Sequence, residues 1–157
     1  MKKFFFDCGT RDATASLGFL ALRVMVGLMM LIGHGIPKIK NYQVNKSLFP
    51  VPDFLPFSLL DHRMSLNLCI AAEVGAALMV ILGFATRPAA FILAFTMVVA
   101  AFSYLGAAPW FQSSPTLVET KELAVLYVIP MIAIILAGAG GYSLDAALCK
   151  DSKRRRW

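Results

Sequence analysis

The sequence predicts an all-α integral membrane protein, a four-helix bundle of antiparallel spans. The chain has 157 residues, of which 59% are hydrophobic and only 15% are charged. Soluble domains are usually about 25% charged. The charged residues cluster between apolar runs of about 20 residues, the length that a helix needs to cross a bilayer. We therefore expect one membrane domain over residues 1–157.

Four apolar segments account for the predicted spans. Only Thr86 and Arg87 separate the second from the third, which predicts a tight antiparallel hairpin. Pro130 lies inside the fourth and is expected to kink it, as neighbouring membrane helices allow. The predicted spans are Leu17–Ile36, Leu66–Ala85, Pro88–Gly106 and Leu123–Gly140.

The basic residues predict an orientation, since Lys and Arg favour the cytoplasmic side of a membrane. With both termini in the cytoplasm, nine basic residues lie on the inner face and five on the outer face. This favours an N-in, C-in topology and places the long loop 37–65 outside. Five of the last eight residues are basic, which explains much of the net charge of +6. With so little polar surface, we expect contact with the lipid bilayer and no binding of nucleic acid.

Polar residues in the first span lie on one face. Arg23 and His34 are eleven residues apart, so at about 100° per residue they differ by only about 20° around the helix. Lys38 follows His34 by four residues, one further turn along the same face. We expect this polar face to point into the bundle.

Glu73 gives the second span a charge of the opposite sign. A charge at the centre of a membrane helix costs about 2.5–3.5 kcal/mol by insertion-based scales, so Glu73 and Arg23 are expected to find partners. By depth, Glu73 lies between Arg23 and His34, and we expect it to bridge them in the outer half of the bundle. Glu122 marks the outer entrance of the fourth span. The predicted site for ligand binding or proton handling comprises Arg23, His34, Lys38, Glu73 and Glu122.

Simpler interpretations of the same residues stay open. Arg23 fits a side chain that snorkels to the inner headgroups, and Glu73 fits a protonated carboxyl hydrogen-bonded between helices. His34 suits a capping group near a helix end, and Glu122 suits a residue that meets a helix dipole. No metal site is expected, because the His, Cys and Glu residues lack ligand spacing.

The order of several short motifs resembles the DoxX family of small four-helix membrane proteins. The matching residues are Arg23, the H-G-x-x-K of His34 to Lys38, the E-x-G that begins at Glu73, Thr86–Arg87 and the S-L-D of Ser143–Asp145. The resemblance implies the cytoplasmic (inner) membrane of a bacterium and a link to redox physiology, since named relatives include subunits of a thiosulfate:quinone oxidoreductase.

These observations lead to three functional hypotheses. In the first, the chain is a subunit or accessory of a quinone- or sulfur-linked redox system, and its polar pocket binds a quinone headgroup or a small anion. In the second, it is a non-catalytic scaffold that recruits a partner. In the third, it is a component of a small transporter, although four spans without a repeat are few for one. A partner redox protein and a homo-oligomer are both compatible with the sequence, and whether the chain is an enzyme is left open.

Overall fold

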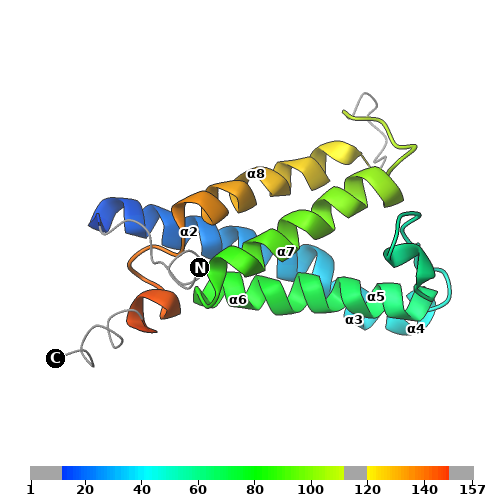
Figure 1. The fold of residues 1–157 in the computed structure, drawn as a ribbon, viewed down its shortest axis with the longest axis horizontal. Coiled ribbons are helices and arrows are strands. Elements are labelled where there is room, and N and C mark those ends of the chain that lie inside the picture. The colour runs from blue at the N-terminus through cyan, green and yellow to red at the C-terminus, as the bar shows by residue number, and fades with distance from the viewer. Residues whose placement is uncertain (1–11, 112–119, 149–157) are drawn as a thin grey trace.

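The computed structural model describes residues 12–111 and 120–148, and every regular element in these ranges is a helix. The long helices lie side by side in a bundle, and a loop with short helices projects at one end (Figure 1). The all-α prediction is confirmed for this part of the chain. Below, the end of the bundle that carries residues 46–61 is called the loop end, and the end that carries the turn 83–85 is called the hairpin end.

The first long helix runs unbroken for 28 residues. It starts after Asp12, whose carboxylate accepts a hydrogen bond from the Ala15 backbone N–H at 2.8 Å, as a helix N-cap does. The predicted span ended at residue 36, but the helix continues to residue 40 and makes Lys38 helical. Its parts are α2 (Ala13–Met30), the π-helical segment η1 (Leu31–Gly35) and α3 (Ile36–Lys40).

The loop end is folded against the second helix. After α4 (Tyr42–Asn45), the chain includes a short 3-10 helix, η2 (Phe57–Leu59). The Ser65 hydroxyl donates a hydrogen bond to the Pro50 carbonyl at 2.9 Å, and the His62 ring nitrogen lies 2.6 Å from a neighbouring loop carbonyl. The loop is therefore fixed to the start of the second helix.

The second and third long helices form the predicted tight hairpin, but the turn precedes the expected position. Gly83 and Ala85 both adopt positive φ angles, of 70° and 43°, and Thr86 already begins the next helix. Glycine suits the left-handed conformation that ends the second helix. The helices comprise α5 (His62–Ile70), η3 (Ala71–Ala76), α6 (Ala77–Leu82), α7 (Thr86–Val99) and η4 (Ala100–Tyr104), of which η3 and η4 are π-helical.

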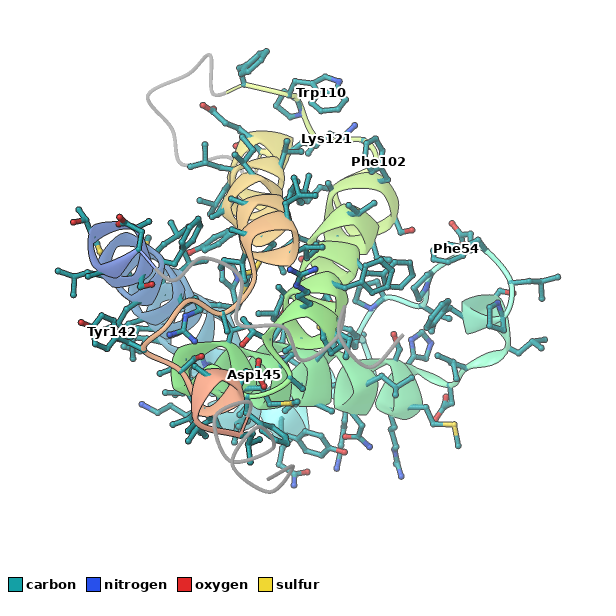
Figure 2. All side chains as sticks on the ribbon, turned by 60° about the vertical axis from the view of Figure 1, so that its left-hand side comes forward. Phe54, Phe102, Trp110, Lys121, Tyr142 and Asp145 are labelled. Atoms are coloured by element: carbon teal, nitrogen blue, oxygen red, sulfur yellow. The ribbon has the colours of Figure 1, made fainter. Side chains whose placement is uncertain are left out.

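The last long helix, α8 (Lys121–Ala137), contains Pro130 and packs along α7. Its start is held by the turn that follows η4. The Lys121 ammonium donates to the Gly106 carbonyl at 2.8 Å and lies 5.2 Å from the centre of the Trp110 ring. Figure 2 shows Lys121, Trp110 and Phe102 gathered at the adjacent ends of the two helices.

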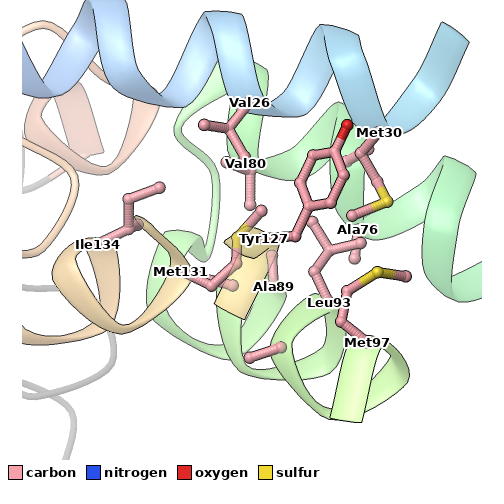
Figure 3. Packing of buried hydrophobic residues seen from close by; sticks show 13 residues of the cluster. Val26, Met30, Ala76, Val80, Ala89, Leu93, Met97, Tyr127, Met131 and Ile134 are labelled. Atoms are coloured by element: carbon pink, nitrogen blue, oxygen red, sulfur yellow. The ribbon is translucent and has the colours of Figure 1, made fainter. Parts of the chain in front are cut away.

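The core between the helices consists of small and medium apolar side chains (Figure 3). Alanines on α6 and α7 let the helices approach closely, as small residues do at membrane helix interfaces. The fully buried side chains at its centre include Met30, Val80, Leu93, Met131 and Ile134.

Three helices in the described ranges are long and apolar enough to cross a membrane: Ala13–Lys40, His62–Leu82 and Thr86–Tyr104. Large apolar side chains are exposed along the outer faces of the bundle, as lipid contact requires. The helix α8 has 17 residues and a length of about 26 Å at 1.5 Å per residue. Its role as a fourth span stays a prediction.

The close approach of α2 to α6 depends on Gly27. A Cβ at this position would lie 2.5 Å from Cγ1 of Ile81 and 3.3 Å from the Ala77 carbonyl oxygen. We predict that Gly27→Ala lowers the free energy of unfolding by about 1–3 kcal/mol, the usual cost of overpacking. Gly18→Ala is the control, because Gly18 lies on the same helix with nothing within 4 Å. Thermal unfolding in detergent compares the two variants, and an equal effect of both would contradict the packing described.

Candidate functional site

The ionisable side chains buried in the bundle form two separate clusters. The sequence predicted one cluster that joined Arg23 to Glu73. Both side chains are buried, at 0% and 2% exposed, so both point away from lipid. However, each has its own partners at its own end of the bundle, as described below.

At the loop end, Glu73 forms an ion pair with Lys38. The Lys38 ammonium donates to both carboxylate oxygens, each at 2.6 Å. The Glu73 side chain is 2% exposed and that of Lys38 is 21% exposed. The Cys69 thiol donates a weaker hydrogen bond to the same carboxylate at 3.4 Å. The carboxylate is thus neutralised by one cation and anchored to one further donor.

His34 lies beside this pair on the first long helix. Its ring packs edge-on against Tyr127 of α8, with 5.4 Å between ring centres. This contact places the imidazole between the first and last helices rather than in lipid. The sequence predicted His34 and Lys38 on one face of the first span and Glu73 opposite them on the second, and the structure brings all three to the same cavity.

A cavity of about 1220 Å³ occupies the loop end, which is larger than the usual range of about 300–1,000 Å³ for small-molecule pockets. Its walls come from every long helix and from the loop, and most of its lining is apolar. Glu122 lines it as an exposed side chain at the start of α8. Its polar and ionisable lining groups include His34, Lys38, Cys69, Glu73 and Glu122.

The cavity is surrounded by three π-helical segments, one in each of the first three long helices. The segment η1 contributes His34, η3 contributes Glu73 and η4 contributes Ser103. A π-helical turn holds about one residue more than an α-helical turn, and such turns inside α-helices occur frequently at functional sites. Nothing in the sequence analysis predicted these segments, because no residue pattern used there distinguishes a π-turn from an α-turn.

The predicted bridge from Arg23 to Glu73 is wrong. Arg23 donates through Nη2 to the Tyr142 carbonyl at 2.6 Å, at the hairpin end, and it does not line the cavity. Fifteen residues separate Arg23 from Lys38, about 22 Å along a helix. The first helix continues for one turn beyond His34, and Lys38 on this turn, rather than Arg23, pairs with Glu73. The apolar core, including Met30 and Val80, lies between the two clusters.

Asp145 organises the cluster at the hairpin end. Its carboxylate accepts hydrogen bonds from the backbone N–H groups of Ala85 and Thr86, at 2.9 and 3.0 Å, and from the Thr86 hydroxyl at 2.9 Å. It therefore caps α7 and is also the acidic group whose charge acts on Arg23. Figure 2 shows Asp145 and Tyr142 on the segment that follows α8. Sequence reasoning identified the S-L-D motif but not this capping role.

Gly83 makes room for Arg23 in this cluster. A Cβ on Gly83 would overlap the guanidinium, and the positive φ of 70° also disfavours any other residue. The Asp145 backbone N–H donates to the Gly83 carbonyl at 2.9 Å. These contacts join the first helix, the α6–α7 turn and the segment after α8.

No group of three or more His, Cys, Asp or Glu side chains gathers within residues 12–111 and 120–148 in a way that could hold a metal ion. The cavity therefore offers an ion pair, an imidazole and a thiol to a ligand. The Lys38 ammonium, the imidazole and the thiol can donate hydrogen bonds, and the Glu73 carboxylate accepts them.

A family model, DoxX, matches residues 18–106, which is more than half of the chain. The chain belongs to the DoxX family. The region matched to DoxX contains His34, Lys38 and Glu73 and all three π-helical segments, and it ends before α8. No curated protein and no solved structure matches the chain. DoxX membership agrees with the helical, multi-pass membrane architecture described above.

The capping role of Asp145 predicts a large loss of stability for Asp145→Ala. Its removal leaves buried donors unpaired and Arg23 without a counter-charge, for which we expect a cost of about 3–5 kcal/mol. Asp12→Ala is the matched control, because Asp12 caps α2 at the surface and such a cap contributes about 1 kcal/mol. Thermal unfolding of both variants in detergent measures the difference, and comparable losses would contradict the role assigned to Asp145.

Proposed function

We propose that this DoxX-family chain is a membrane subunit or accessory of a redox system, and that its cavity binds the headgroup of a quinone. The observation that carries the proposal is the convergence of three π-helical segments on one large, mainly apolar cavity with a neutralised ion pair in its wall. A mostly apolar cavity with a few polar groups is typical of a small-molecule site.

The charge balance favours a neutral ligand over a sulfur oxyanion. Lys38 already donates to both oxygens of Glu73, and Arg23 lies outside the cavity. Glu122 adds a negative charge at the entrance. An anion would therefore meet little uncompensated positive charge, whereas a quinone carbonyl needs only hydrogen-bond donors, which His34 and the remaining Lys38 N–H supply.

The cavity groups also suit proton handling. Reduction of a quinone to a quinol takes up a pair of electrons and a pair of protons, and oxidation releases both. In this proposal His34 and the ionised Glu73 accept the two protons of a quinol as it is oxidised, and return them to the carbonyl oxygens when a quinone is reduced. The electrons pass to or from a partner redox protein, which the proposal requires.

We further propose four spans with both termini in the cytoplasm of a bacterium, so that the cavity lies in the outer half of the inner membrane. The excess of basic residues at the termini and at Arg87 supports this orientation. The length of α8 supports a fourth span. A homo-oligomer is compatible with the exposed apolar faces.

The hairpin-end cluster favours a second candidate, a scaffold whose buried charges serve only to specify helix packing. The hydrogen bonds in this cluster join segments of the chain to one another, as the contacts of Asp145 with Thr86 and of Arg23 with Tyr142 show. The scaffold candidate does not account for the large cavity at the other end. A transporter is less well supported, because the apolar core separates the two polar clusters and offers no polar path between them.

The quinone proposal predicts that the protein retains quinone when it is extracted with native lipid and analysed by mass spectrometry. We expect His34→Phe to weaken quinone binding about tenfold, because loss of one hydrogen bond to a buried ligand corresponds to roughly 1–1.5 kcal/mol. The phenyl ring preserves the packing against Tyr127.

His34→Gln is the matched variant, since it restores an N–H donor and is expected to recover part of the affinity. If the wild-type protein retains no quinone and binds none that is added, the proposed function is wrong. If the wild type, His34→Phe and His34→Gln bind quinone equally well, His34 is not part of the binding site.

A further inference from the structure

The cavity continues along α7 as a groove. On α7 and η4 its lining extends from Ser103 to Ile92, eleven residues or about 16 Å along the helix. On the facing helix, the lining extends from Glu73 through Gly75 to Met79. The groove therefore leads from the Lys38–Glu73 pair toward the middle of the bundle, and its deeper part is apolar.

This groove is open on the outer, apolar face of the bundle. Leu68, Ile92 and Phe95 line it and are also 50%, 43% and 40% exposed. Gly75 is an exposed lining residue, and a Cβ added there would meet no atom within 4 Å, so a larger side chain has room at this edge of the groove. The same apolar face would contact lipid, so this opening of the groove faces the membrane interior.

Aromatic rings cover the loop end of the groove. Phe57 of η2 packs on Phe95 of α7 with 5.8 Å between ring centres, and Phe54 lies 5.3 Å from Phe57. The hydrogen bonds from Ser65 and His62 to the loop hold this cover in place. These rings cover the groove at the loop end, while Leu68 and Ile92 stay exposed along its side.

We infer that the groove between η3–α6 and α7 holds the isoprenoid tail of a membrane quinone, while the headgroup lies beside Lys38 and Glu73. This inference rests on the proposed function and adds the ligand class, a long-tailed quinone. A phospholipid acyl chain fits the apolar groove less well at its polar end. Its phosphate needs a cation, and Lys38 is already paired.

The groove gives selectivity through packing. In a bilayer the tail leaves surroundings as apolar as the groove, so the gain comes from close contact with the groove walls rather than from the hydrophobic effect. Gly75 is the position where a larger side chain fills this space without touching the ion pair. The glycine of the E-x-G motif is then a specificity-determining residue.

The test compares a quinone with a long isoprenoid tail and a tail-less benzoquinone of the same ring substitution. Binding of each to the purified full-length chain in nanodiscs is measured for the wild type, Gly75→Leu and Gly33→Leu. Gly33 is the matched control, because it lies in the π-helical segment η1, has nothing within 4 Å and does not line the cavity.

We expect the wild type and Gly33→Leu to bind the tailed quinone at least tenfold more tightly than the tail-less one. Gly75→Leu should lose this preference and keep the tail-less affinity. If Gly75→Leu does not fold, Ile92→Trp replaces it, with the exposed Ile132→Trp on α8 as its control.

Two results would overturn the tail groove while leaving the proposed function intact: equal wild-type affinity for both quinones, or identical behaviour of Gly75→Leu and Gly33→Leu. Displacement of the tailed quinone by a phosphatidylglycerol added in competition would also overturn it, in favour of a phospholipid occupant. If the wild type binds neither quinone, the proposed function fails, and the groove inference fails with it.

Discussion

The ion pair between Lys38 and Glu73 is the interaction on which the loop end of the molecule depends. An isolated carboxylate in a membrane bundle is costly, and it becomes tolerable when a cation and further donors surround it. Lys38 reaches Glu73 because the first helix continues beyond the predicted end of the span, and Glu73 itself lies in the π-helical segment η3. The pair removes net charge from the cavity wall, and this neutrality decides which ligands suit the cavity.

The two polar clusters have different tasks. At the hairpin end, Asp145 accepts three hydrogen bonds at the start of α7, and its negative charge acts on the Arg23 guanidinium. Gly83 leaves room for this guanidinium. Almost every contact there joins segments of the chain to one another. At the loop end, by contrast, the charged groups face a cavity, and the helices that surround it depart from regular α-helical geometry. The contacts that hold the helices together are therefore at the hairpin end, and the cavity that could hold a ligand is at the loop end.

The sequence predicted the helical class, the approximate bounds of the first three spans, the hairpin and the shared face of His34 and Lys38, because apolar length and helical periodicity are local properties of the chain. It failed on the partner of Arg23. Helical rise gives a depth only within one span, and the sequence does not show how far one helix is shifted against another. The sequence also did not show that the first helix continues to Lys40, and this extension makes Lys38 rather than Arg23 the neighbour of Glu73. Asp145 was missed for a related reason, since its hydrogen-bond partners lie about 60 residues away in the chain.

The central claim, that Lys38 and Glu73 form one neutral unit in the cavity wall, is tested most directly by a double-mutant cycle on the free energy of unfolding. Lys38→Met and Glu73→Met each leave one buried charge alone, and we expect each to cost about 3–5 kcal/mol. The double variant replaces the pair with apolar side chains and should be nearly as stable as the wild type, which gives a large coupling energy. Additive losses in the double variant would contradict the account, because they would mean that the two side chains do not act as a pair.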